Sequence, residues 1–468
     1  MPTASACAGA AESDSRAAAV ARTPLDVWIA RKIGQASGPL EPRALAAWQT
    51  ERLRQTVSRA KQCSAFYREA LHDVRSDAFQ SPRDVALLPL TTAARLRSSG
   101  SRMLCVGAHE VERIVTLATS GTEGDPKRVF FTAEDLELTV DFFRHGMATF
   151  TGAGDRVLVL MPGARSGSVG DLLQSGLARE DASAAVHGPV SDIDEALAVL
   201  ERTQPSVVVG IPTQVLALAR RGAARGRPIR SVHSVLLSAD HVPRAVVRAV
   251  EALWRCRVFN HYGSTEMGFG GGVECAARDG YHLRAADLLF EIVSPETELP
   301  VADGEAGEIV FTTLTRAGMP LLRYRTGDMS RFLPGRCACG SLLPRLAPVG
   351  TRPAAAVFLR GGGRLQLADL DEAVLGRPDV IDFAPLLSGD GRRDELHILA
   401  RPVGEGARVD TAALERAVLR VPAVAAAAAG GVLGVRVAVA ADGEGWPAST
   451  GMLKRTFEDT RPAEEAHA

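Results

Sequence analysis

The chain has 468 residues, of which 46% are hydrophobic and 23% are charged, and its formal net charge is −1. This composition is ordinary for a globular protein, and the length favours two or three domains over one. The near-zero net charge excludes a sequence-wide basic field, so we expect neither nucleic acid nor an anionic membrane as a partner.

Residues 1–40 are predicted to be a disordered leader. They begin with MPTASACAGAAESDSRAAAVAR, which contains acidic residues and no long apolar core and therefore does not suit a secretory signal. A membrane-spanning helix needs about eighteen or more consecutive apolar residues. The stretch that comes nearest, residues 421–441, is rich in Ala and Gly and contains Arg436, and it is interpreted as buried strand or turn. A cytoplasmic protein is expected.

Helical spacing of Leu45, Trp48, Leu53 and Val57 predicts helix within residues 41–75. A further helix is expected after the threonines of LLPLTTAARLR. Two strands, in ERIVTLATS and RVFFT, flank a Gly-rich loop, and Thr132 is placed to cap a helix with Glu134 and Asp135 in its first turn.

Short β-branched segments then alternate with helical ones. The strand candidates are RVLVLMPG, PSVVVGIPT, SVLLSAD and CRVFNHYG, and the helix candidates between them include DIDEALAVLERT and RAVVRAVEALW. This alternation predicts a largely parallel, doubly wound sheet, whose ligands bind beyond the carboxyl ends of its strands. The block LLFEIVSPETELPVADGEAGEIVFTTL instead predicts antiparallel strands.

The fold class is therefore predicted to be α/β. We expect a large domain over residues 41–352, which includes the antiparallel β subdomain. A small, mobile C-terminal α+β domain is expected over residues 353–468.

Three loops carry residues suited to nucleotide chemistry. In ATSGTEGDPK, residues 118–127, small residues let backbone N–H groups approach phosphate oxygens and Lys127 adds charge. In NHYGSTEMG, residues 260–268, Tyr262 suits stacking on a base and Glu266 suits Mg²⁺. In RYRTGDM, residues 323–329, Asp328 suits two ribose hydroxyls. Taken singly, each loop fits an ordinary turn equally well.

Taken together and in this order, the three loops resemble those of the AMP-forming acyl- and aryl-CoA synthetases, and in particular the phenylacetate–CoA ligase-like branch. The resemblance runs from SRAKQCSAFYREAL through TSGTEGDPK, YGSTE and GEIVFTTLTRAGMPLLRYRTGD to CACGSLLPRLAPVGTR, and covers about four fifths of the chain.

This resemblance implies roles for individual residues. The phosphate-binding loop matches Thr119, Ser120, Gly121, Thr122, Gly124 and Lys127. The adenine-facing turn matches Tyr262, Gly263 and Ser264, beside His261 and the neighbouring strand end of Ser238, Ala239 and Asp240. Phosphate contact falls to Thr265, Mg²⁺ binding to Glu266, ribose binding to Asp328, and the position before the hinge to Arg352.

The implied reaction joins a carboxylic acid to AMP with release of pyrophosphate, and then passes the acyl group to a thiol, usually that of coenzyme A. The implied cofactors are ATP, Mg²⁺ and coenzyme A. An acyl carrier protein or an amine is the alternative acceptor, and a homodimer is possible. A small-residue pocket from residues 162–173, 210–214 and 268–273 suggests an aryl or medium acyl acid.

The cysteines suggest a second metal. The odd total of seven argues against a disulfide framework. Cys275 and His282 form one pair, Cys337 and Cys339 another, and together they make a tetrahedral set suited to structural Zn²⁺. Some members of the resembled branch show a similar arrangement. The alternative is chance proximity of reduced thiols and an imidazole.

Two features depart from the family pattern. In the hinge segment GTRPAAAV, Thr351 replaces the usual glycine, and Ala354 and Ala355 stand where acids are expected. In PASTGMLKRTFEDTR, Met452 follows Gly451 where the catalytic lysine is usual, and Lys454 arrives two residues later. Lys454 is the candidate replacement, with a solvated surface charge as the alternative. These departures leave open a degenerate homologue that binds nucleotide without turnover.

Overall fold

The computed structural model describes residues 20–35, 38–117, 126–350, 352–404, 406–441 and 455–462. The N-terminal part of these residues is helical. Its α-helices are α1 (Pro24–Lys32), α2 (Pro42–Cys63), α3 (Ala65–Ala70) and α4 (Ala93–Ser99), and its 3₁₀ turns are η1 (Ser76–Ala78), η2 (Pro82–Leu87), η3 (Gly100–Met103) and η4 (Ala108–Glu110). As predicted, Thr92 caps α4 by accepting from the backbone N–H of Arg95.

The prediction that the disordered leader extends to residue 40 is wrong. Residues 24–32 form α1, which buries Leu25, Trp28 and Ile29 and packs against α5 (Ala133–Met147). Trp28 donates a hydrogen bond from Nε1 to Asp141 on α5 at 2.8 Å. A Pro near the first helical position and burial of this apolar face stabilise the helix, and the surrounding polar residues concealed it in the sequence.

A two-stranded hairpin follows, made of β1 (Arg113–Leu117) and β2 (Lys127–Phe131). The strands are antiparallel, and Leu117 pairs with Lys127, so both ends of the Gly-rich segment are held by the ladder. Helix α5 begins as predicted, because Thr132 accepts from the Asp135 N–H and the Asp135 carboxylate accepts in return from the Thr132 N–H.

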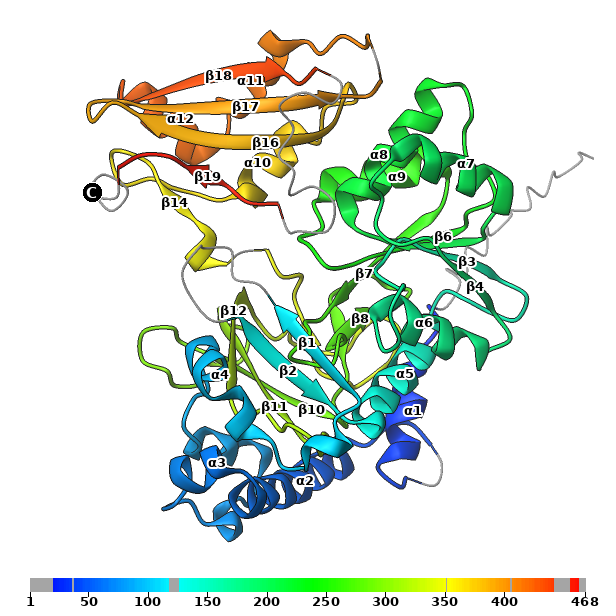
Figure 1. The fold of residues 1–468 in the computed structure, drawn as a ribbon, viewed down its shortest axis with the longest axis vertical. Coiled ribbons are helices and arrows are strands. Elements are labelled where there is room, and N and C mark those ends of the chain that lie inside the picture. The colour runs from blue at the N-terminus through cyan, green and yellow to red at the C-terminus, as the bar shows by residue number, and fades with distance from the viewer. Residues whose placement is uncertain are drawn as a thin grey trace, which may run out of the picture.

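The predicted parallel sheet is present within an eight-stranded sheet ordered β13-β9-β8-β7-β6-β5-β3-β4 (Figure 1). Strands β3 to β7 pair in parallel, whereas β8, β9 and β13 extend the sheet antiparallel beyond β7. The strands are β3 (Arg156–Val159), β4 (Ser183–Val186), β5 (Val207–Gly210), β6 (Ser234–Leu237), β7 (Arg257–Tyr262), β8 (Gly272–Glu274), β9 (Tyr281–Leu283) and β13 (Arg345–Leu346), and the helices are α6 (Val169–Ala178), α7 (Ile193–Thr203), α8 (Pro212–Ala224) and α9 (Arg244–Trp254).

The predicted antiparallel block forms a separate three-stranded sheet of β10 (Leu288–Val293), β11 (Gly307–Thr313) and β12 (Tyr324–Ser330). All residues of β10 and β11 are buried. Figure 1 shows this sheet beside the β1–β2 hairpin, below the C-terminal elements. The α/β fold class is therefore confirmed.

The C-terminal elements include a four-stranded sheet ordered β18-β17-β16-β19. They are η5 (Pro353–Ala355), β14 (Val357–Phe358), β15 (Arg364–Leu365), α10 (Leu367–Val374), β16 (Val380–Gly389), β17 (Asp394–Pro402), α11 (Thr411–Val418), α12 (Pro422–Ala429), β18 (Leu433–Val439) and β19 (Glu458–Asp459). The strand-or-turn prediction for residues 421–441 is wrong in its first half, since α12 is helical. Its Ala run has the highest helix propensity, and Pro422 suits the first turn.

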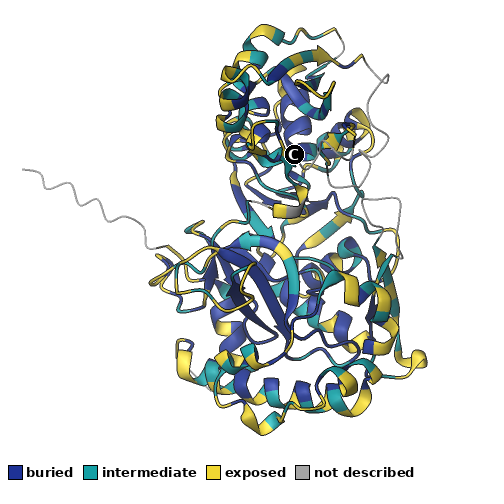
Figure 2. Ribbon diagram, turned by 90° about the vertical axis from the view of Figure 1, so that its left-hand side faces the viewer, coloured by how far each residue is buried: buried dark blue, intermediate teal, exposed yellow. Residues whose placement is uncertain are grey.

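The hydrophobic core has two main clusters. One joins the N-terminal helices, the hairpin and the β10–β12 sheet, and the other joins α7, α8 and α9 to the C-terminal elements. Figure 2 shows buried residues on the strands and exposed ones mainly on the outer helices. Because the second cluster is continuous across residue 353, it does not mark a boundary there, and the domain limits of residues 41–352 and 353–468 stay a prediction. Among the described residues, no helix has the length and apolarity to span a bilayer.

Candidate active site

An ion pair joins the hairpin to the turn that follows β7. Lys127, the first residue of β2, places Nζ 2.6 Å from Oε1 of Glu266. The hydroxyl of Tyr324, on β12, donates to the same oxygen at 3.1 Å. The Lys127 side chain is 22% exposed and that of Glu266 only 6%. Three separate elements therefore meet at one buried carboxylate.

The surroundings of Glu266 keep it ionised. Burial alone would raise the pKa of this carboxyl, but the charge and hydrogen bond of Lys127 outweigh it and hold the pKa below its usual value. Arg316, in the loop after β11, donates to the backbone oxygen of Glu266 at 2.8 Å and lies over the Phe131 ring. Burial lowers the pKa of Arg316 to about 10.

A second charged pair lies on the same strand as Tyr324. Asp328 accepts a hydrogen bond from the Tyr262 hydroxyl at 2.9 Å and pairs through its other oxygen with Nε of Arg352. Burial and the charge of Asp328 raise the pKa of Tyr262 well above its usual value. Burial alone would lower the pKa of Arg352, but Asp328 raises it. Two tyrosine–carboxylate hydrogen bonds thus connect strand β12 with the end of β7 and the turn after it. Tyr324 donates to Glu266, and Tyr262 donates to Asp328.

The turn that bears Glu266 is tight. The Ser264 carbonyl accepts from the N–H groups of Met267 and Phe269, and the Thr265 carbonyl accepts from that of Gly268. A Cβ on Gly263 would lie 2.4 Å from the carbonyl oxygen of Phe269, so this position excludes a side chain. The turn holds Tyr262, Thr265 and Glu266 on one short backbone segment.

The predicted strand end of Ser238, Ala239 and Asp240 lies next to this turn. The Ser238 hydroxyl and Nδ1 of His261 are 2.8 Å apart, and Ala239 has a positive φ of 72°. Burial lowers the pKa of His261 to about 4, so the imidazole is neutral. Asp240 lies 3.7 Å from Nε of Arg455, which links this edge to the C-terminal segment.

Several predicted site residues lie outside the described residues. These are Thr119, Ser120, Gly121, Thr122 and Gly124 of the Gly-rich loop, Thr351 of the hinge, and Lys454. Their predicted roles stay predictions. The described neighbours of the first group, Leu117 and Lys127, show where the loop leaves and rejoins the hairpin.

Sequence reasoning missed Tyr324 and Arg316, both of which contact Glu266. Both lie in the stretch GEIVFTTLTRAGMPLLRYRTGD, in which Asp328 was the residue predicted to have a site role. The sequence did contain an indication of their role. An arginine or tyrosine close to a ribose-binding motif needs a polar partner if it is buried. The identity of that partner required the tertiary structure.

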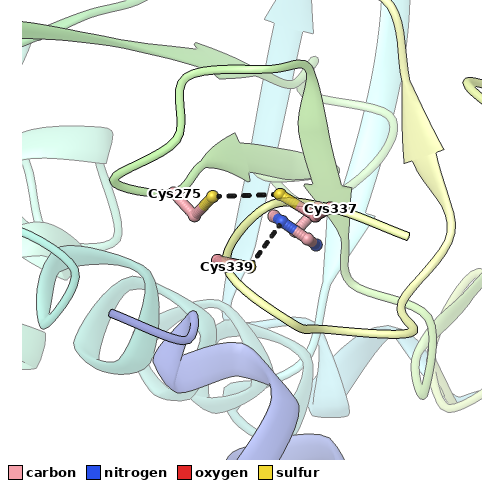
Figure 3. A group of neighbouring side chains, drawn as sticks. Cys275, Cys337 and Cys339 are labelled. Atoms are coloured by element: carbon pink, nitrogen blue, oxygen red, sulfur yellow. Dashed lines mark hydrogen bonds between the residues drawn. The ribbon is translucent and has the colours of Figure 1, made fainter. Parts of the chain in front are cut away.

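The four predicted metal ligands meet in one place. Ligand atoms of Cys275, His282, Cys337 and Cys339 all lie within 4.8 Å of one another, and all four residues are buried. Sγ of Cys275 is 3.6 Å from that of Cys337, and Sγ of Cys339 is 3.5 Å from Nε2 of His282. Figure 3 shows the three cysteines turned toward a common centre. Ligands around tetrahedral zinc lie about 3.5–3.8 Å apart, as its bond lengths require.

The chemistry of this set also fits a metal. Burial lowers the pKa of His282 to about 4, which gives the neutral imidazole that metals bind. Its Nδ1 has no hydrogen-bond partner among the described residues. Cys275 comes from the β8–β9 connection, His282 from strand β9, and Cys337 and Cys339 from the segment before β13, which pairs with β9. The chance-proximity alternative does not explain four converging buried ligand atoms.

A family model described as AMP-binding enzyme matches residues 47–315, more than half of the chain. The chain belongs to the AMP-binding enzyme family. The resemblance noted from the sequence is thereby confirmed.

Among proteins of known function, this AMP-binding enzyme is similar to the phenylacetate-coenzyme A ligase of Thermus thermophilus. The two are 28% identical over 368 residues, which cover 76% of this chain and 80% of the relative. The phenylacetate-coenzyme A ligase of Aromatoleum evansii is 29% identical over 77% of this chain and 84% of its own.

Solved structures show the same fold. A 2-hydroxyisobutyryl-CoA ligase in the postadenylation state, bound to R3-HIB-AMP, superposes with a TM-score of 0.74 at 20% identity and covers 89% of each chain. The anthranilate CoA ligase AuaEII with anthranoyl-AMP gives a TM-score of 0.52 at 15% identity, over 73% of this chain and 65% of the other.

Proposed function

We propose that this protein is an AMP-forming carboxylate–CoA ligase. A carboxylate oxygen of the acid attacks the α-phosphorus of ATP and pyrophosphate leaves, which yields an acyl adenylate. The thiol sulfur of coenzyme A then attacks the acyl carbonyl, the thiol proton is lost, and AMP leaves. The charge that develops on phosphate in the first step needs cations and backbone donors around it.

The convergence of Lys127, Glu266, Asp328 and Arg352 carries this proposal. They come from the hairpin, the turn after β7, strand β12 and the start of the C-terminal part, and the match to the AMP-binding family spans the first two. Paired cations and carboxylates beside the carboxyl end of the parallel strand β7 suit a nucleotide with its metal.

Magnesium fits this site because Glu266 is a buried, ionised carboxylate on which a cation already rests. Glu266 would hold Mg²⁺, which when bound screens the phosphate charge. Lys127, Thr265 and the Gly-rich loop would contact phosphate, Asp328 the ribose, and the segments of Ser238–Asp240 and His261–Ser264 the adenosine.

The relatives' activity suggests an aryl or medium acyl acid as substrate, with coenzyme A as acceptor. Pyrophosphate release from ATP across a panel of aryl and acyl acids, with and without coenzyme A, tests both. We expect release with aryl acids and a further rise with coenzyme A. Release without that rise would indicate a carrier-protein thiol or an amine as acceptor. No release with any acid, together with ATP binding, would indicate the degenerate homologue. The homodimer and the cytoplasmic location stay predictions.

Lys454 is proposed as the lysine that reaches the carboxylate and α-phosphate during adenylation. Its neighbour Arg455 lies beside Asp240 at the edge of the site, which supports the placement. We expect Lys454→Ala to lower adenylation at least 100-fold and Met452→Lys in the same chain to restore part of it. Adenylation of the single variant within a few-fold of the wild type would rule out this role.

We further propose a structural zinc ion held by Cys275, His282, Cys337 and Cys339. Four protein ligands leave no open position for catalysis. We expect about one zinc per chain in untagged protein, loss of it in Cys339→Ser, and a lower Tm in that variant, whereas Cys63→Ser, at an exposed thiol, should change neither. Zinc far below one per chain would contradict the proposal.

A further inference from the structure

Glu266 uses its two carboxylate oxygens unequally. Oε1 accepts from both Lys127 and Tyr324, at 2.6 and 3.1 Å. Both of these side-chain hydrogen bonds reach the same oxygen, and within the described part of the chain Lys127 makes the one ion pair to this carboxylate. A buried carboxylate without a cation is strongly disfavoured. Lys127 is therefore the counter-charge of Glu266 in a site without nucleotide.

The two arginine side chains near Glu266 do not pair with its carboxylate. Arg316 donates to the backbone oxygen of Glu266, not to its carboxylate. Arg352 forms its ion pair with Asp328. Among the cationic side chains that the structure describes, Lys127 alone contacts Oε1, the oxygen that would hold a metal ion.

A free divalent cation gains little from a carboxylate that is already neutralised, and it would be repelled by the ammonium that shares the same oxygen. Lys127 is the more exposed partner of the pair, and it is the first residue of strand β2. A polyphosphate arriving beside Lys127 offers the ammonium several negative oxygens and frees Glu266.

We propose that Lys127 occupies the metal position on Glu266 until nucleotide binds, so that Mg²⁺ enters this site only together with ATP. The lysine is a counter-ion that exchanges partners: Glu266 in the empty site, phosphate in the filled one. This inference rests on the proposed function for the identity of the nucleotide, but its nucleotide-free part concerns Glu266 and Lys127 alone.

Mn²⁺ alone, followed by its electron paramagnetic resonance signal at pH 8, tests the exchange without any turnover. Wild type and Glu266→Gln should bind Mn²⁺ equally weakly when no nucleotide is present. With a non-hydrolysable ATP analogue, wild type should bind Mn²⁺ at least 10-fold more tightly than Glu266→Gln. A nucleotide-free Mn²⁺ site in wild type that Glu266→Gln removes would overturn the proposal, and so would equal Mn²⁺ affinity of the two proteins with the analogue bound.

The decisive variant is Lys127→Met, with Lys61→Met as the matched control, because Lys61 is bonded to the Val74 carbonyl of the distant helical region. Without nucleotide, Lys127→Met should bind Mn²⁺ at least 10-fold more tightly than wild type, and Glu266→Gln in the same chain should cancel the gain. No gain in the folded variant would overturn the exchange. Failure of wild type to bind the ATP analogue would instead refute the proposed function, since the nucleotide-free comparison does not use it.

Discussion

Asp328 shows how one residue ties the site together. Its two oxygens bind the Tyr262 hydroxyl and the Arg352 guanidinium, so it connects the turn after β7 to the start of the C-terminal part. Asp328 and Tyr262 are both buried, so the bond between them is shielded from water, whereas Arg352 is partly exposed; both bonds depend on the negative charge of Asp328.

Asp328→Asn should weaken ATP binding and stability together. The amide keeps the shape but leaves Arg352 without a counter-charge, and a buried charge-assisted bond contributes about 1.5–3 kcal/mol. We expect the KM for ATP to rise at least tenfold, the KM for the acid to change little, and the free energy of unfolding to fall by about 1–3 kcal/mol. Pyrophosphate-release kinetics and urea unfolding measure these quantities.

Asp303→Asn is the matched control, since Asp303 pairs with Arg83 at 3.9 Å on the exposed surface, where such pairs contribute little. A normal KM for ATP in Asp328→Asn would show that this carboxylate does not hold the nucleotide.

At the scale of elements, the end of β7 and the turn that follows it position Tyr262, Thr265 and Glu266. Gly263 allows this course, because any Cβ there would overlap the Phe269 carbonyl oxygen, whose nearest approach would be 2.4 Å. Backbone atoms cannot move aside as the end of a flexible side chain can.

We therefore expect Gly263→Ala to distort the turn, lower adenylation at least 100-fold and cost about 1–3 kcal/mol of stability, the range typical of overpacking. Pyrophosphate release and urea unfolding measure the two effects. Gly152→Ala is the control, because nothing lies within 4 Å of a Cβ there. An active Gly263→Ala enzyme would mean that the turn relaxes without moving Glu266.

At the scale of the whole molecule, the C-terminal elements are docked on helices α8 and α9. Arg220 of α8 donates to the carbonyl oxygens of Leu375 and Val380, and Glu372 of α10 accepts from the N–H of Ala245. Arg455, which makes two hydrogen bonds to Asp371 within the C-terminal elements, also lies 3.7 Å from Asp240 in the connection between β6 and α9.

Asp382, beside this contact, should make stability depend on pH. Burial raises its pKa to about 6, so the folded chain holds a proton that the unfolded chain has already lost between about pH 4 and pH 6. Stability should fall as pH rises through that interval and stay lowered above it. Asp382→Asn should therefore raise the free energy of unfolding by about 1–2 kcal/mol at pH 7.5, less than a full two-unit shift would give, and the gain should vanish below pH 4.

Urea unfolding at pH 7.5 and pH 4 tests this expectation. Asp390→Asn is the control for a carboxyl whose pKa is shifted in the other direction. Backbone N–H groups of Arg392 and Arg393 lower the pKa of Asp390, so this substitution should not raise the free energy of unfolding at pH 7.5. A pH-independent effect of Asp382→Asn would show that packing, not ionisation, accounts for it.

The amino-acid sequence by itself determined the alternation of strands and helices, the capped start of α5 and the three motif loops. These features are local: periodicity, caps and turn residues act over a few positions, so they are legible without the fold. The same locality explains the missed α1, whose stability comes from burial against α5 rather than from its own residues. It also explains α12, where apolar Ala residues suit both helix and buried strand.

Only the tertiary structure decided which charged groups meet. Glu266 with Lys127 and Tyr324, Asp328 with Tyr262 and Arg352, and Asp371 with Arg455 join segments that lie far apart in the chain. A buried charge needs an oppositely charged or hydrogen-bonding partner. Which residue becomes that partner depends on how the elements pack, and no local sequence pattern specifies it. The sequence therefore named the candidates, and the packing of the sheets and helices selected their partners.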